Sequence, residues 1–148
     1  MSMEQQIQQD IKAAMLAKEK VKLESLRAVK AAILLAKTAD GSETISDEAV
    51  LKIIQKLVKQ RKESAELYKA QNRPELAENE LAEAAAMEVF LPKQLTEEEL
   101  AVELKKIIEA VGAKGPQDMG KVMGTATKQL SGKAEGKAIS AMVKQLLA

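Results

Sequence analysis

The sequence predicts an all-α protein, and three observations lead to that prediction. Only 1% of the 148 residues are aromatic, so the core must be built from Leu, Ile, Val, Met and Ala, as is typical of helical proteins. Apolar residues recur at three- and four-residue spacing along most of the chain, and no segment alternates as a strand does. The chain contains only three prolines. Its length suits one domain or two small ones.

Two helices are expected before residue 42. Ser2 and Gln5 have the form of a capping box, which begins a helix, and a short polar turn is expected at 18–20. The second helix is predicted over about 21–38, and the Asp-Gly-Ser turn at 40–42 ends it. Its apolar stripe consists of Leu23, Leu26, Val29, Ile33 and Ala36.

Two longer elements are expected between residues 46 and 89. Ser46 is the predicted N-cap of a third helix that reaches about Gln71. Pro74 suits the first turn of a fourth helix, because the N–H that proline lacks would have no helical partner there. The apolar stripe of the third helix is Val50, Ile53, Ile54, Leu57 and Val58, continued by Ala65 and Leu67–Tyr68. The weaker stripe of the fourth helix is Leu76, Leu81, Ala84, Ala85 and Glu88, and the alanines at 84–86 suggest a close helix contact.

A domain boundary is predicted at Pro92, which disfavours helical backbone at Leu91. We therefore expect an N-terminal domain of about four helices over 1–91 and a C-terminal domain of three helices over 92–148. Thr96 with Glu99 is a second capping box, which begins a helix over 97–111. The last two helices are expected from near Pro116 and from about 136 to the C-terminus. The first of these has the apolar face Met119, Val122, Met123, Ala126 and Leu130.

The composition excludes several kinds of site. The chain has no cysteine and no histidine, so it lacks thiolate metal ligands and any Ser-His or Cys-His pair. The carboxylates at 97–99 are interpreted as first-turn residues that suit the helix dipole. We expect no catalytic residue, no metal and no cofactor. No apolar run is long enough to span a membrane and the first ten residues do not resemble a signal peptide, so a cytoplasmic protein is expected.

Glycine is concentrated in the last third of the chain. Six of the seven glycines lie at or after Gly112. Gly120 and Gly124 fall inside a helical pattern, where each costs roughly 1 kcal/mol relative to alanine. We expect them to allow close packing of this helix on a neighbouring helix. The alternative is that their bare backbone lets RNA approach.

The same third is basic, with six lysines and two acidic residues from Gly112 onward. Lysines near the start of the final helix could contact phosphates, with no sequence specificity. A solvated lysine face is the competing interpretation. No aromatic residue is available there for stacking on unpaired bases, so folded RNA is the expected ligand. The candidate RNA-binding residues are Lys121, Lys128, Gly132, Lys133, Gly136 and Lys137.

A second and weaker basic surface could form if the second and third helices lie side by side. Its residues are Arg27, Lys30, Lys59, Arg61 and Lys62. We favour the alternative that Arg27 and Arg61 pair within the chain, with Glu24, Glu63 or the acidic fourth helix.

Four segments resemble signatures of the YqeY family. They are RAVKAA at 27–32, KQRKES at 59–64, LPKQLTEEEL at 91–100 and MGKVMG at 119–124, and the likeness covers essentially the whole chain. The resemblance implies an all-helical protein in two parts. It also implies that the C-terminal part is similar to the tail domain of the B subunit of the glutamine-dependent amidotransferase, which converts Glu-tRNA(Gln) or Asp-tRNA(Asn) to the amidated form.

One turn departs from the family pattern. It reads G-K-A-E-G at 132–136, where the family has G-R-A-D-G, and lysine cannot make the bidentate phosphate contact of arginine. The catalytic regions of the amidotransferase lie outside the resemblance, so it does not imply catalysis.

Three functions are therefore expected in decreasing order. The first is a non-catalytic binding module for tRNA or an aminoacyl-tRNA complex. The second is a protein-interaction scaffold that binds a protein partner through the second to fourth helices. The third, which depends on family analogy alone, is a carbon–nitrogen ligase with glutamine as amido donor, or an accessory to one.

Overall fold

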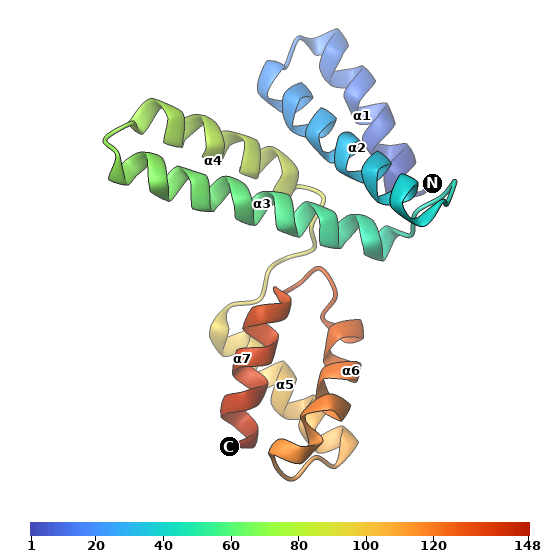
Figure 1. Ribbon diagram of the computed structural model, residues 1–148, viewed down its shortest axis with the longest axis vertical. Helices are drawn as coiled ribbons and strands as arrows, with labels where there is room; N and C mark the ends of the chain where they lie inside the picture. The colour runs from blue at the N-terminus through green and yellow to red at the C-terminus, as the bar shows by residue number, and fades with distance from the viewer. The chain divides into compact units, whose positions relative to one another are not determined.

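The computed structural model describes all residues, 1–148, and confirms the all-α prediction. It contains seven α-helices, one short 3-10 helix and no strand (Figure 1). The chain divides into two compact units, Met1–Leu91 and Pro92–Ala148. Each unit has its own hydrophobic core. No helix combines the length and the apolar composition needed to cross a membrane.

The N-terminal unit consists of two helical hairpins. The helices are α1 (Met3–Ala17), α2 (Lys20–Asp40), α3 (Asp47–Ala70) and α4 (Pro74–Glu88). Figure 1 shows α1 antiparallel to α2 and α3 antiparallel to α4, and α2 also packs on α4. The buried core consists of Ile7, Ile11, Leu26, Val29, Ile33, Val50, Ile54, Val58, Ala84 and Met87.

The predicted helix starts in this unit are confirmed. The Ser2 N–H donates to Gln5 Oε1 (3.0 Å) and the Gln5 N–H to Ser2 Oγ (3.2 Å), so both halves of the capping box form. Ser46 Oγ accepts from the Ala49 N–H at 3.2 Å, and Pro74 occupies the first turn of α4. These bonds satisfy N–H groups that have no partner within the helix.

The apolar stripes of α3 and α4 were predicted wrongly in part. Leu67 is exposed because the buried positions 54, 58 and 65 leave it on the opposite face of α3. In α4 the buried residues are Ala77, Ala84 and Met87, whereas Leu76 and Leu81 are exposed. The small alanines let α4 pack closely on α3, whereas leucines at the same positions would hold the two helices further apart.

Arg61 lies on α3 between the buried residues Val58 and Ala65. Its Nε is buried without a hydrogen bond and lies 3.9 Å from Glu83 Oε2 of α4. Pairing of Arg61 with the acidic fourth helix, the interpretation we favoured, is thus confirmed. Burial raises the pKa of the Glu83 carboxyl, and the opposing effect of Arg61 is smaller.

Glu83 is expected to make the stability of the N-terminal unit depend on pH. Because folding raises its pKa, its contribution is fully present below the ordinary carboxyl pKa of 4.5 and decreases as the pH rises through the folded value. Glu83→Gln cannot ionise, so its free energy of unfolding should fall less than that of the wild type as the pH rises from about 4.5 to 7. Urea unfolding at several pH values gives the free energy of unfolding of both proteins. The same dependence of this free energy on pH in the wild type and in Glu83→Gln would contradict the prediction.

The C-terminal unit consists of α5 (Glu97–Val111), the 3-10 helix η1 (Pro116–Asp118), α6 (Met119–Gln129) and α7 (Gly136–Leu147). Gly112 ends α5 with φ 70, a left-handed conformation that glycine adopts without strain. Met119 and Met123 pack at the edge of the core, as expected, and Met142 packs there too. The buried core is Leu100, Leu104, Ile107, Val122, Ala126, Leu130, Ile139, Val143 and Leu147.

The capping box at the start of α5 is also confirmed. The Glu99 N–H donates to Thr96 Oγ1 and the Thr96 N–H to Glu99 Oε1, both at 3.1 Å. The hydrogen bond from the Thr96 N–H to this carboxyl, followed by the effect of the Thr96 side chain, lowers the pKa of Glu99. Leu91 packs on the core of the N-terminal unit and Leu95 on that of the C-terminal unit, so the connecting segment is fastened at both ends.

We expect Thr96→Ala to reduce the unfolding free energy of the C-terminal unit by about 1 kcal/mol, the typical value of one N-cap. Thr96→Ser should retain most of the stability because serine keeps the hydroxyl acceptor. Thermal unfolding followed by circular dichroism compares the three proteins. An equal loss of stability in Thr96→Ala and Thr96→Ser would show that the threonine methyl group, and not the N-cap hydrogen bond, stabilises the unit.

Candidate nucleic-acid interface

The outward face of α6 exposes two glycines. Val122 and Ala126 are buried, whereas Gly120 and Gly124 lie on the opposite, exposed side. A Cβ built on either glycine would have no atom within 4 Å, apart from the surrounding helix itself. The expectation that these glycines allow close packing of α6 on another helix is therefore wrong. The physical reason is that the apolar stripe, which faces α5 and α7, points the glycines away from both.

No contact within the chain explains these glycines. Neither has a positive φ, so an alanine could adopt the same backbone conformation. Glycine in an exposed helix interior destabilises the helix by roughly 1 kcal/mol relative to alanine. The structure thus carries a stability cost that no neighbouring residue of the unit offsets.

Two lysines lie beside the glycines on the same outward face. Lys121 and Lys128 are seven residues apart, which places them about 10 Å apart along the helix axis. Both are exposed, and neither forms an ion pair. We call Gly120, Lys121, Gly124 and Lys128 the glycine–lysine face.

The turn between α6 and α7 is held by the segment that precedes α5. Gly132 is buried with φ 77, a backbone conformation that favours glycine. Gln94 Nε2 donates to the Gly132 carbonyl (2.6 Å), and the Leu95 N–H donates to the Lys133 carbonyl (2.9 Å). These bonds fix the backbone of the turn while the Lys133 side chain remains exposed.

Gln94 is a positioning residue that was not among the predicted site residues. It lies in the LPKQL segment, but nothing in that pattern shows a hydrogen bond to a residue 38 positions further on.

The start of α7 presents N–H groups beside two lysines. Glu135 is the N-cap residue, and its side chain forms no capping hydrogen bond. Gly136 is exposed, has no positive φ, and a Cβ there would meet no atom within 4 Å. It is a third glycine that the fold does not require. Lys137 is exposed in the first turn, where the helix dipole attracts anions.

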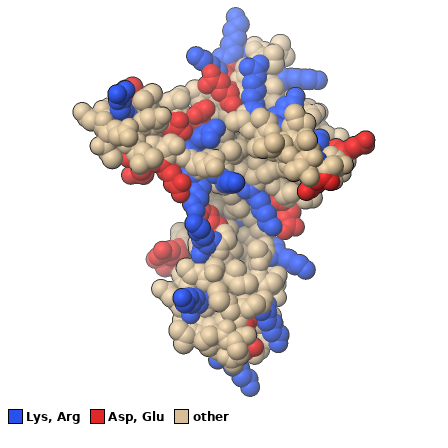
Figure 2. All heavy atoms as spheres, in the orientation of Figure 1, with Lys and Arg blue, Asp and Glu red and all other residues tan.

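The structure brings most of the predicted RNA-binding residues to one end of the C-terminal unit. Lys128 lies in the last turn of α6, Lys133 in the turn that follows and Lys137 in the first turn of α7. Lys121 lies two turns further along α6. In the view of Figure 2, lysine side chains project from this unit at several separate points. The arrangement could hold several phosphates.

The second predicted basic surface is partly neutralised. Arg61 pairs with Glu83, and Lys62 Nζ lies 2.5 Å from Glu88 Oε1, so both cations face acids of α4. Arg27 and Lys30 are exposed on α2 and form no ion pair, so the expectation that Arg27 pairs within the chain is wrong. Lys59 is half-buried on α3. Since α3 directs part of its positive charge toward α4, this set is a poorer candidate for binding a polyanion.

Comparison with known proteins identifies the family. The YqeY-like protein model matches residues 4–147, which is nearly the whole chain. The chain belongs to the YqeY-like family. Two fungal relatives carry the name "Altered inheritance of mitochondria protein 41, mitochondrial". The one from Meyerozyma guilliermondii is 42% identical over 86 residues, or 57% of this chain and 44% of that protein. The one from Pyrenophora tritici-repentis is 32% identical over 131 residues, or 86% of this chain and 71% of that protein.

These relatives bear on the expected location and function of this YqeY-like chain. Their names place the fungal proteins in mitochondria and state no ligand or reaction. The match spans less than half of the Meyerozyma protein. A cytoplasmic location and an association with tRNA therefore stay predictions for this chain.

Proposed function

We propose that the C-terminal unit is a non-catalytic binding module for folded RNA of the tRNA class. Contact is made through the glycine–lysine face of α6 together with the 132–137 segment. The observation that carries this proposal is the exposure of Gly120, Gly124 and Gly136 at positions where the fold does not require glycine.

Bare backbone would allow a bulky partner to approach closely. With no Cβ on the outward strip, a sugar–phosphate backbone can lie nearer to the helix axis than it could on an alanine or leucine surface. Lysines beside the strip then reach phosphate oxygens. This combination would explain the presence of destabilising glycines at positions that pack against nothing in the unit.

The charges support an anionic ligand whose sequence is not read. Lys121, Lys128, Lys133 and Lys137 are exposed without ion pairs, and the start of α7 offers N–H groups. Phosphate contacts of this kind determine affinity and register but do not distinguish bases. The unit has no aromatic residue, so unpaired bases have no ring on which to stack.

The choice of tRNA among folded RNAs rests on the family. The resemblance to the tail domain of the amidotransferase B subunit implies tRNA as the ligand class. A role as an accessory to that carbon–nitrogen ligase depends on the same analogy. No contact in the structure favours a catalytic role.

Competition between folded and unfolded RNA tests the proposal. Fluorescently labelled bulk tRNA is titrated with the full chain, and unlabelled tRNA or a single-stranded polyuridine with the same number of phosphates is added as competitor. We expect tRNA to compete at least about tenfold better, because the surface offers phosphate contacts and no stacking. Absence of binding, or equal competition by the single strand, would contradict the proposal.

A further inference from the structure

The outward face of α2 in the N-terminal unit exposes an apolar patch. Leu34 and Leu35 are 60% and 73% exposed, and Ala31 is exposed one turn before them. These residues follow the i, i+3, i+4 spacing that places side chains on one face of a helix. Single exposed leucines are ordinary on protein surfaces, but here two adjoin each other.

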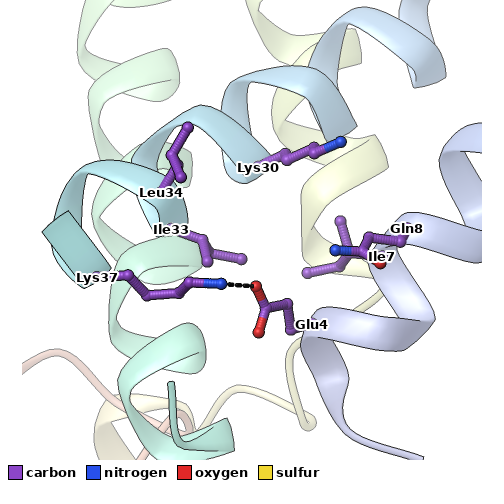
Figure 3. Close-up of a pocket in the computed structure, with 7 residues that line it drawn as sticks. All are labelled: Glu4, Ile7, Gln8, Lys30, Ile33, Leu34 and Lys37. Carbon is purple, nitrogen blue, oxygen red and sulfur yellow. Dashed lines mark hydrogen bonds and ion pairs between the residues drawn. The ribbon is translucent and has the colours of Figure 1, made fainter. Parts of the chain in front are cut away.

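A hollow lies beside this patch, between α1 and α2. Figure 3 shows Ile7 from α1 and Ile33 from α2 pointing into it, with Leu34 above. Its volume is about 120 Å³. An apolar cavity of about 150 Å³ holds a benzene-sized group, so this hollow suits one aliphatic side chain.

The rim of the hollow is basic. Lys37 Nζ pairs with Glu4 Oε2 at 2.6 Å, which neutralises both groups at one end. Lys30 lines the other side and forms no ion pair. Arg27 lies one turn earlier on α2, is exposed and is also without an ion pair. The apolar patch is therefore bordered by two uncompensated cations.

We propose that Ala31, Leu34 and Leu35, the adjoining hollow, and the cations Arg27 and Lys30 form a docking face for an acidic amphipathic helix of another protein. One apolar side chain of that helix enters the hollow and a second covers Leu34 and Leu35. Carboxylates on its flank face Arg27 and Lys30. This is helix-in-groove recognition, in which apolar anchors give affinity and flanking charges give orientation.

The docking face is independent of the proposed RNA interface, because it consists of other residues in the other unit. The exposed leucines argue against RNA at this face, since they offer phosphates no favourable contact.

A designed peptide tests the proposal and requires no identified partner. The probe is a fluorescein-labelled amphipathic helix of about 18 residues, with leucines at three- and four-residue spacing and glutamates on both flanks. A second peptide has lysine in place of each glutamate. We expect the full chain to bind the glutamate peptide at least about tenfold more tightly than the lysine peptide, measured by fluorescence anisotropy.

Two variants locate the binding. Leu34→Gln with Leu35→Gln should weaken binding of the glutamate peptide at least about tenfold, and Arg27→Glu with Lys30→Glu should reverse the preference between the peptides. Leu67→Gln is the matched control, because Leu67 is 64% exposed on α3. All three variants change exposed side chains, and their melting curves verify folding.

Several results would overturn the proposal. The first is equal affinity for the glutamate and lysine peptides. The second is that Leu67→Gln weakens binding of the glutamate peptide as much as the Leu34/Leu35 variant does. The third is that the Leu34/Leu35 variant still binds the glutamate peptide as tightly as the wild type. Light scattering that shows a dimer in the wild type but a monomer in this variant would mean that a second copy covers the face. Sedimentation of the wild type, but not of this variant, with anionic phospholipid vesicles would mean that a lipid surface does.

Discussion

Replacing four lysines of the C-terminal unit with alanine is expected to weaken tRNA binding about 100-fold at physiological salt. This estimate takes roughly 0.7 kcal/mol for each exposed phosphate contact. The slope of log affinity against log salt should also become shallower by about one for each lysine removed. The lysines are Lys121, Lys128, Lys133 and Lys137, and filter binding over a range of salt concentrations gives both quantities.

A matched control distinguishes the loss of specific contacts at the proposed interface from the effect of a lower net charge on tRNA binding. Four other exposed lysines of the same unit lie outside the predicted site and away from the segment that precedes α5, on α5, in the loop that follows it and near the end of α7. Changing these to alanine alters the net charge by the same amount, and we expect less than about a threefold loss of affinity. If both sets weaken binding equally, the interface is not where we place it. The control lysines are Lys105, Lys106, Lys114 and Lys144.

Replacing Gly120 and Gly124 with alanine is expected to change stability and binding in opposite directions. Gly124 lies in the helix interior and Gly120 in the first turn of α6, and a Cβ at either meets nothing, so the two alanines should stabilise the C-terminal unit by about 1 kcal/mol or somewhat more. If the bare backbone lies against RNA, two methyl groups on that surface should weaken tRNA binding about tenfold. Chemical denaturation and filter binding on the same preparation measure the two effects.

Gly112→Ala provides the contrasting control. Gly112 has φ 70, so alanine there is strained, and the unit should lose about 1 kcal/mol of stability. If tRNA affinity simply followed the stability of the unit, the more stable Gly120/Gly124 variant would bind tRNA at least as tightly as the wild type. That outcome would leave the exposed glycines without the role that we propose.

Much of the fold could be predicted because its signals are local. Capping boxes at Ser2 and Thr96, the N-cap at Ser46 and the proline that begins α4 each mark a helix start within a few residues. Helix ends were predicted within two residues where glycine follows, as at α2 and α5. These signals depend on backbone hydrogen bonding near the helix end, which the sequence determines directly.

The burial of particular side chains was harder to predict. Leu67 continued the apolar pattern of α3 in sequence, but the α3–α4 contact buries Ala65 and places Arg61 beside Glu83. In α4, Ala77 and Ala84 are buried whereas Leu76 and Leu81 are exposed, which reverses the order that hydrophobicity alone suggests. Packing distance between two helices decides such cases, and one sequence does not reveal it.

One feature of the candidate site could be predicted from the sequence and another could not. The stripe Met119, Val122, Met123, Ala126 and Leu130 already places Gly120 and Gly124 on the opposite face, so their exposure could have been predicted. The hydrogen bond from Gln94 to Gly132 could not, because it joins residues that are distant in the chain.

The most direct test of the RNA interface uses the seven glycines as probes. Selective ¹⁵N-glycine labelling gives one amide signal for each, and tRNA is added while the signals are followed by NMR. We predict that the signals of Gly120, Gly124 and Gly136 shift or broaden, and that those of Gly41 and Gly112 do not. Perturbation of Gly41 or Gly112 with no change at Gly120 and Gly124 would contradict an RNA interface on α6.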